Sequence, residues 1–331
     1  MAKIDGKTNL LTKTKKSSLL GPFLTFLVIT FVVFLLTDIL KINNIRGDWR
    51  FLTGGNALNV LSQVSINAII SYGMTLIIII LGIDLSVGSI IALSGVSFIG
   101  FYEMAGIPFI LSILLTLVLG LVLGAFNGVI IAKAKIPPFV VTLGSNMLFR
   151  GIALVLCDGI PWASSKQPFL DIAGKNVFGV IPMPIIILIV VTVIFYYLLH
   201  KTRFGRYVYA IGGNEETARL AGINVDWTKI KIFTLSGIAA SISGLILASK
   251  IGSGAPLSGD GYELDAVAAT VIGGTSISGG VGRIVGTLIG AMIIGVISNG
   301  MNLLNIEAYW QYVIRGGIIL IAMILDYRSH S

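Results

Sequence analysis

The chain has 331 residues, of which 55% are hydrophobic and only 11% are charged, and its mean hydropathy is +0.96. This composition excludes a soluble domain with a polar surface and predicts an integral membrane protein. The net charge of +8 does not indicate nucleic-acid binding, because the basic residues flank apolar runs, and a single cysteine, Cys157, excludes an internal disulfide.

The first apolar run, residues 19–40, follows a start that contains five lysines. It is longer than the apolar region of a signal peptide, and no convincing small-residue cleavage site accompanies it. We therefore predict a cytoplasmic tail at 1–18, followed by a membrane-spanning helix that is retained.

Further apolar runs recur along the chain, and their length indicates helices instead of the short alternating strands of a barrel. The predicted fold class is all-α, a polytopic integral membrane protein with about ten transmembrane helices. We assign one transmembrane domain at 19–326 and a cytoplasmic tail at 327–331. The predicted spans are 19–40, 57–81, 86–102, 107–132, 138–157, 181–199, 230–250, 264–280, 284–304 and 309–326.

Lysines and arginines predict the orientation of these spans. With the N-terminus inside, the inner segments hold 15 of these residues and the outer segments hold six. Because cytoplasmic loops carry an excess of Lys and Arg, both termini are predicted to be cytoplasmic.

Uncharged polar residues follow one face of the predicted span 57–81. They recur every four residues, which keeps them within an arc of ~120° on a helix, at Gln63, Asn67, Ser71 and Thr75. This pattern is typical either of a polar path or of hydrogen bonds between neighbouring helices.

The span 138–157 carries polar residues at three- and four-residue spacing, namely Thr142, Ser145, Asn146 and Arg150. An arginine at the centre of a span costs about 2.5 to 3.5 kcal/mol on insertion scales, so Arg150 requires a partner. Asp84 and Asp158 are the carboxylates we consider as partners, although Asp84 is favoured as the N-cap of the span 86–102. Arg315 raises the same question, and we assign it no partner.

The longest inner loop, 201–229, contains the charged stretch GGNEETARLAGINV at 212–225. It carries an N-cap, two acids for the first turn, a basic residue four positions on and a terminal glycine, at Asn214, Glu215, Glu216, Arg219 and Gly222. The pattern predicts about two turns of helix, which only packing can hold in place. These signals fit an ordinary capped loop helix as well as a docking element.

Glycines four residues apart, such as Gly120 with Gly124 and Gly286 with Gly290, predict close contacts between helices. The segment 273–282, GGTSISGGVG, is too rich in glycine for a straight helix. We predict there either a broken helix, as found at some transporter substrate sites, or a tight turn.

Glu216, Thr217 and Ala218, followed by Gly222 and then Ile232, resemble the E-A-A-x-x-x-G-x9-I loop by which permeases of ATP-binding cassette (ABC) importers dock onto ATPase subunits. Thr217 stands where that motif has its first alanine, but it is still small. From about residue 45 to 326 the chain resembles the ribose-type permeases of bacterial monosaccharide ABC importers. Three stretches carry this resemblance: GIDLSVGSIIALSGV (82–96), GRYVYAIGGNEETARLAGINV (205–225) and GYELDAVAATVIGGTSISGGVGRIVGTLIGA (261–291).

The resemblance implies the ABC importer permease fold and a membrane-spanning subunit of an ATP-driven importer for ribose or a related monosaccharide, surrounded by lipid of the cell inner membrane. It implies a homodimer, occasionally a heterodimer, of permeases. It also implies cytoplasmic ATP-binding subunits that hold ATP and magnesium, and an external sugar-binding protein, with no cofactor on this chain.

The resemblance assigns ATPase coupling to Gly213, Asn214, Glu215, Glu216, Ala218, Arg219 and Gly222. In that role the charged residues would set register, Ala218 and Ala221 would allow close approach, and Gly212, Gly213 and Gly222 would give the turns their backbone freedom. A sugar path requires uncharged polar groups along apolar helices, and the candidates are Gln63, Asn67, Ser71, Thr75, Asn146 and Arg150.

The alternative is an ATP-independent carrier or channel for a small polar solute, for which Asp84 is the only embedded acid near a span. A membrane enzyme is disfavoured, because His200 and His330 lie at a span end and at the C-terminus and no catalytic set surrounds them. The sequence contains neither metal-ligand spacing nor a G-x-x-x-x-G-K-[ST] phosphate loop, so ATP hydrolysis is assigned to a partner subunit.

Overall fold

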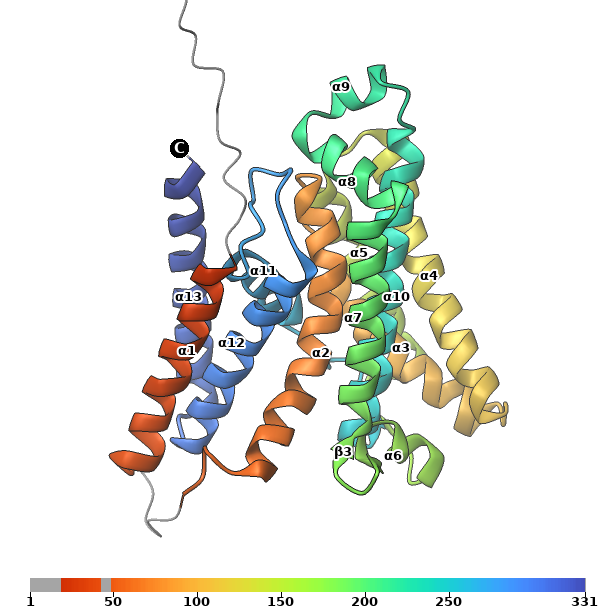
Figure 1. The fold of residues 1–331 in the computed structure, drawn as a ribbon. Helices are drawn as coiled ribbons and strands as arrows, with labels where there is room; N and C mark the ends of the chain where they lie inside the picture. The colour runs from red at the N-terminus through yellow and green to blue at the C-terminus, as the bar shows by residue number, and fades with distance from the viewer. Residues whose placement is uncertain (1–18, 43–48, 331) are drawn as a thin grey trace, which may run out of the picture.

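The computed structural model describes residues 19–42 and 49–330, the last six of them as backbone only. The elements form a bundle of long helices with shorter ones at its two ends (Figure 1). The helices are α1 Leu20–Phe34, which continues as the π-helical turn η1 Leu35–Ile39; α2 Gly54–Ile79; α3 Val87–Ile99, which continues as η2 Gly100–Met104; α4 Phe109–Ala134; α5 Pro138–Leu156; α6 Gln167–Gly174; α7 Met183–Lys201; α8 Arg203–Gly213; α9 Glu215–Leu220; α10 Val225–Ile251; α11 Tyr262–Ile272; α12 Ile284–Leu303; and α13 Ala308–His330.

Two short antiparallel pairs complete the fold. The strand β1 Trp162–Ala163 pairs with β4 Ser253–Gly254, and β2 Asn176–Val177 pairs with β3 Ile181–Pro182. Each pair is two residues long, so the fold class is all-α as predicted.

Eight helices are long and apolar enough to cross a membrane: α1 with η1, α2, α3 with η2, α4, α5, α7, α10 and α12. The described part of α13 adds a shorter apolar helix, Ala308–Ile324. The prediction of a multi-pass membrane protein is therefore confirmed. The helix α13 continues to His330, so the described part of the predicted tail at 327–331 is helical.

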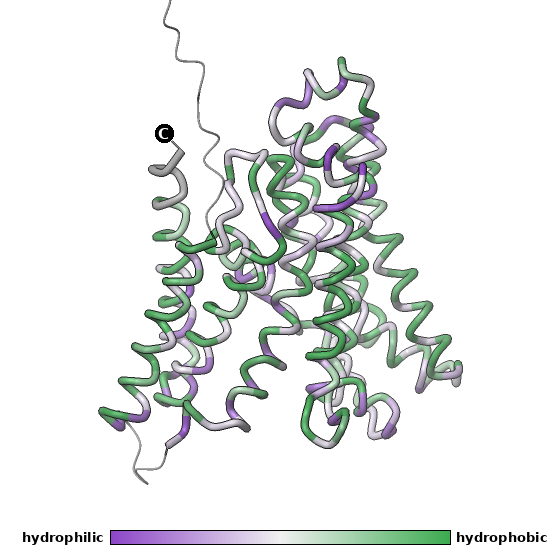
Figure 2. The backbone as a smooth tube through the Cα atoms, viewed as in Figure 1, coloured by the Kyte–Doolittle hydropathy of each residue, from purple (hydrophilic) through white to green (hydrophobic). Residues whose placement is uncertain are grey.

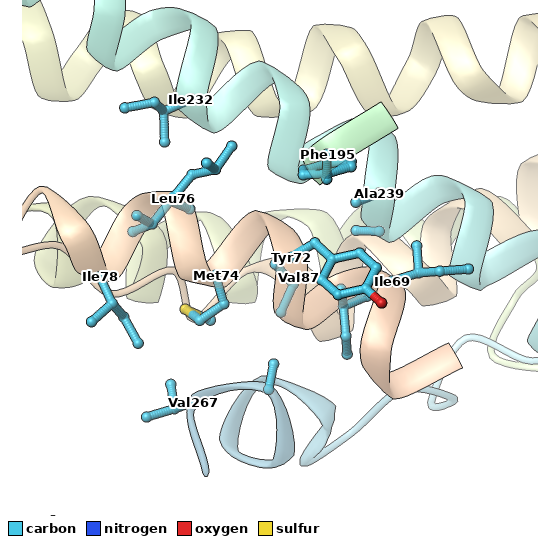
Figure 3. Packing of buried hydrophobic residues seen from close by; sticks show 14 of the residues in the cluster. Ile69, Tyr72, Met74, Leu76, Ile78, Val87, Phe195, Ile232, Ala239 and Val267 are labelled. Carbon is cyan, nitrogen blue, oxygen red and sulfur yellow. The ribbon is translucent and has the colours of Figure 1, made fainter. Parts of the chain in front are cut away.

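The core surrounds α2. In its most apolar window 89% of the residues are buried, against 28% for α4 and α5, whose outer faces are left for lipid. Side chains of α2 such as Tyr72 and Leu76 pack between Phe195 of α7 and Ile232 of α10 (Figure 3). The helix starts because the Thr53 hydroxyl accepts the backbone N–H of Asn56 at 3.2 Å.

Glycines set the closest helix contacts, as their four-residue spacing predicts. A Cβ added at Gly124 of α4 would overlap the carbonyl oxygen of Phe233 on α10, and one at Gly290 of α12 would overlap that of Ala269 on α11. Neither position has room for any side chain, so these backbones touch directly.

The predicted span 264–280 is wrong in its form. Only α11 is helical there, and its 11 residues rise about 16 Å, too little to cross a bilayer. The segment 252–261 precedes it and is mostly turns after the two strand residues of β4. It lies beside α3, where added Cβ atoms at Gly254 and Gly259 would lie 2.7 Å and 2.6 Å from the carbonyl oxygens of Gly95 and Gly88. Segment and helix together take the place of a straight span.

The glycine-rich stretch 273–282 forms a tight loop between α11 and α12, not a second helical break. Gly274, Gly279 and Gly280 have positive φ angles, between 70° and 87°, and Ser276 N–H donates to the Val281 carbonyl at 3.1 Å. Left-handed backbone of this kind is available to glycine without strain.

The two ends of the bundle differ. The first turn of α1 and the C-terminal end of α13 point to the end that carries α8 and α9, and α6 and β3 lie at the opposite end (Figure 1). Both described termini thus share a side with the loop 201–229.

Candidate functional site

The charged stretch forms a separate short helix, α9, as predicted. Asn214 is its N-cap, with the side-chain Oδ1 accepting the backbone N–H of Thr217 at 2.7 Å. Gly222 adopts φ +84° just past its end, and the Ile223 N–H donates to the Ala218 carbonyl at 3.1 Å. These bonds satisfy groups that so short a helix leaves open.

Ion pairs attach α9 to the start of α10. Glu215 pairs with Arg219 at 3.5 Å and with Lys229 at 2.7 Å, and Arg219 pairs with Asp226 at 3.1 Å. Lys133 at the end of α4 lies 4.0 Å from Asp226. The hydrogen bond that Arg219 donates to the Asp226 carboxylate raises the pKa of Arg219 above its usual range. Exposed pairs are individually weak, so the value of this network is to fix the position of α9.

The outward face of α9 differs from the expectation. Ala218 is 3% exposed and packs against its own chain, so it leaves no contact for a partner, while Leu220 is 83% exposed. Glu215 and Arg219 are occupied within the chain. Glu216, Leu220 and Ala221 are among the exposed residues that remain, and we call these three the outer face of α9.

The glycines of this region also act differently from the expectation. Gly212 and Gly213 belong to α8 and have ordinary helical backbone, and only Gly222 needs the left-handed conformation. A Cβ at Gly212 would overlap the carbonyl oxygen of Ile79, whereas one at Gly213 would meet nothing within 4 Å. Gly212 therefore allows α8 to rest on the end of α2.

The loop 273–283 contacts both the end of α2 and the helix α8. The Gly280 N–H donates to the Ile79 carbonyl at 2.9 Å, and the Tyr209 hydroxyl donates to the Gly282 carbonyl at 2.7 Å. Burial raises the pKa of Tyr209 to about 12, so its hydroxyl stays a donor at neutral pH. Through α8, the short helix α9 is connected to the central helix α2 and to the start of α12.

The polar stripe of α2 divides into two halves. In the half nearer α8, which we call the inner half, Ser71 and Thr75 are 0% exposed. The Thr75 hydroxyl lies 2.6 Å from that of Thr287 on α12, and Thr270 of α11 donates to the Ser71 carbonyl at 3.3 Å. The Thr75 hydroxyl thus connects α2 to α12, which is one of the alternatives that the spacing left open, whereas the Ser71 hydroxyl donates to the Asn67 carbonyl of its own helix at 2.6 Å.

The outer half of the stripe, which is the half farther from α8, differs in its hydrogen bonding. Gln63 is half-buried, and Asn67 is 6% exposed with a buried Oδ1 that accepts no hydrogen bond from any described residue. A buried amide oxygen without a donor is costly unless water or a ligand supplies one.

Arg150 of α5 finds backbone partners instead of the predicted carboxylates. Its guanidinium donates to the carbonyls of Pro256 and Ser258, at 2.9 Å and 2.6 Å. Both carbonyls belong to the segment 252–261, and Arg150 supplies a donor for each of them. Four residues earlier on α5, Asn146 also has a buried Oδ1 with no donor in the described structure.

Asp84 is neither the partner of Arg150 nor the N-cap of α3, which is Ser86. Its carboxylate accepts the Ser86 N–H at 2.9 Å and hydroxyls of Ser86 at 2.6 Å and of Ser236 on α10 at 3.2 Å. The Asn127 amide in turn donates to the Ser86 hydroxyl at 2.8 Å. This buried cluster holds α3, α4 and α10 together.

Sequence reasoning missed two features. Arg315 of α13 pairs with Asp265 of α11 at 3.3 Å, and nothing in the spacing indicated this pair. The segment 252–261 did carry a signal, since it combines four glycines with Pro256, a composition typical of turns. Among the described residues no group of three or more His, Cys, Asp or Glu side chains is placed to hold a metal ion.

Comparison with known proteins places this geometry among transport permeases. The family model described as "Branched-chain amino acid transport system / permease component" matches residues 56–323. The chain is 45% identical over 313 residues to the ribose import permease protein RbsC of Bacillus subtilis (strain 168), covering 94% of each chain. It is 38% identical to the D-allose transport system permease protein AlsC of Escherichia coli (strain K12), covering 88% of this chain and 90% of the relative. It is 37% identical to the xylose transport system permease protein XylH of Haemophilus influenzae, covering 86% and 92%.

Proposed function

This chain belongs to the family of branched-chain amino acid transport system permease components, and we propose that it is the membrane-spanning subunit of an ATP-driven importer of ribose or a related monosaccharide. The observation that carries the proposal is α9, a capped helix that is fixed to the transmembrane helices but keeps an open outer face. The names of the relatives supply the class of substrate.

In this proposal α9 is the coupling helix. Its outer face, Glu216, Leu220 and Ala221, seats in a cytoplasmic ATPase subunit that binds ATP and magnesium. Movement of that subunit pushes α9, and the contact of Gly212 with Ile79 passes the displacement to α2. A rigid-body change of this kind requires a packed connection, which α8 supplies.

The sugar path would use the unsatisfied polar groups of the outer half of the bundle. The amide oxygens of Asn67 and Asn146 have open acceptor capacity, and Gln63 adds a half-buried amide. Sugar hydroxyls can donate to these oxygens without any charge on the ligand. Arg150 would hold the segment 252–261 beside that route.

The remaining partners follow from the two ends of the bundle. A second permease copy completes the path, and an external sugar-binding protein docks on the end that carries α6 and the hairpin β2–β3. The excess of lysine and arginine on the α9 side supports cytoplasmic termini.

Charge reversal at Glu216 tests the coupling role. Glu216→Lys should lower ATPase co-purification and sugar uptake more than tenfold, because like charges juxtaposed at an interface cost several kcal/mol. Gly222→Pro should do the same, since proline cannot adopt φ +84°. Uptake is measured with radiolabelled ribose, xylose and allose in cells that carry the whole importer.

The matched control is Lys175→Glu, an exposed charge reversal on the opposite end of the bundle. All variants should reach the membrane at wild-type levels. Wild-type recovery of the ATPase with Glu216→Lys and Gly222→Pro would show that α9 does not dock it.

A further inference from the structure

A cavity of about 210 Å³ lies between α8 and the first turns of α10, next to α9. It is lined by Arg203, Phe204 and Tyr207 of α8 and by Asn224, Trp227 and Lys231 of α10. Two cations and three aromatic rings thus face one small space. None of these groups belongs to the proposed coupling face or to the proposed path.

The two cations have no acidic partner. Neither Arg203 nor Lys231 takes part in any ion pair of the described structure, although Lys231 lies 5.5 Å from the ring centre of Trp227. The nearby carboxylate of Asp226 is already engaged by Arg219 and Lys133. The cavity therefore has a net positive charge and calls for an anion.

The position of the cavity selects the kind of anion. The helix α8 follows directly on α7, packs Val208 and Ile211 into the protein core and exposes Arg203 and Arg206 at the end of an apolar membrane-spanning helix. Half-exposed Trp227 and Tyr207 are residue types enriched at the level of lipid headgroups. Hydrophilic colour gathers on this end of the bundle, above the apolar lengths of α7 and α10 (Figure 2).

We propose that this cavity binds the phosphodiester headgroup of an anionic phospholipid, such as phosphatidylglycerol. The Arg203 guanidinium offers paired N–H donors to two phosphate oxygens, and the Lys231 ammonium adds a second charge. A cavity of about 210 Å³ has room for one phosphodiester headgroup.

A bound phosphate would bridge α8 to α10 through Arg203 and Lys231. The lipid would then hold the loop 201–229 in position. This role does not depend on which solute the protein transports.

The test uses the full chain, stripped of lipid in detergent, with dioleoyl-phosphatidylglycerol or dioleoyl-phosphatidylcholine added and bound lipid counted by native mass spectrometry. The wild-type chain should retain phosphatidylglycerol preferentially. Arg203→Gln with Lys231→Gln should weaken its binding about 10- to 30-fold, as expected for two phosphate-facing cations. Arg203→Lys with Lys231→Arg should keep most of it.

The matched control is Lys201→Gln with Arg206→Gln, which removes two exposed cations of the same region outside the cavity. An equal loss with the control pair, or equal retention of phosphatidylcholine, would overturn the proposal in favour of a diffuse surface charge. Competition by millimolar inorganic phosphate would assign the site to a free anion. Loss of the bound lipid on adding the ATPase subunit would show that a protein covers the cavity.

A second measurement leaves the cavity unaltered. The substitutions Trp49→Phe, Trp162→Phe and Trp310→Phe leave Trp227 as the only tryptophan of the protein. Phosphatidylglycerol with brominated acyl chains should quench the Trp227 fluorescence at a lower mole fraction than phosphatidylcholine with the same brominated acyl chains. Identical quenching curves for the two lipids would also overturn the proposal.

Discussion

Single residues on α2 distinguish a path from a helix contact. Ser71 and Thr75 are enclosed by α11 and α12 and have partners, whereas Asn67, one turn further out, has a buried oxygen without one. The same four-residue spacing thus places a bonded hydroxyl pair and an unsatisfied amide oxygen on one helix face, and we propose that only the latter faces the path.

Asn67→Leu should lower sugar uptake at least fivefold without lowering thermal stability. Leucine removes an unpaired polar group, a change that is neutral or stabilising if the residue is only structural. Uptake per membrane-inserted chain and the melting temperature of the purified protein measure the two effects separately.

Thr75→Val provides the contrast to Asn67→Leu. It should cost about 1 kcal/mol of stability by breaking the bond to Thr287, with uptake per folded chain unchanged. Wild-type uptake with Asn67→Leu would remove the outer half of the stripe from the path.

At the scale of elements, α8 is the connection on which the proposed coupling depends. It rests on α2 at Gly212, bonds the loop 273–283 through Tyr209, and continues into α9 after one residue. A short helix with contacts on both sides moves as a unit, so a displacement at α9 reaches the core.

Gly212→Ala should uncouple transport, because the new methyl group would overlap the Ile79 carbonyl and force α8 away from α2. We expect at least a tenfold fall in uptake per ATP hydrolysed, measured in proteoliposomes with the ATPase subunit. The neighbouring Gly213→Ala is the matched control, since its methyl group meets open space. It should transport normally, and equal effects of the two substitutions would exclude close packing as the cause.

For the whole molecule, the arrangement predicts which loops face the cytoplasm. Leu220 in α9 is 83% exposed and Phe178 in the hairpin β2–β3 is 91% exposed, at opposite ends of the bundle. In a Cys157→Ser background, a membrane-impermeant maleimide should label Phe178→Cys in intact cells and Leu220→Cys only in inside-out vesicles. The reverse pattern would invert the proposed orientation, and the cysteine-free parent controls for background.

Much of the architecture was predictable because apolar length and caps are local properties. The spans around α2, α4, α7 and α12 follow from runs of about 20 apolar residues, and α9 follows from Asn214 and Gly222. The non-helical segment 252–261 could not be predicted in this way, because Arg150, which stabilises it, lies over a hundred residues away in the sequence. For the same reason the sequence left the partners of Arg315 and Asp84 undetermined.

The segment 252–261 constrains the order in which the parts of the chain can fold. Its amide and carbonyl groups cannot be exposed to hydrocarbon, and the shelter it uses is built by α3 and by Arg150 of α5. The ribosome makes α3 and α5 earlier than this segment. The last third of the chain can therefore fold only against an N-terminal half that is already assembled. A full-length chain in which α5 is not packed correctly would leave the segment 252–261 unsheltered, and membrane proteases should degrade such a chain.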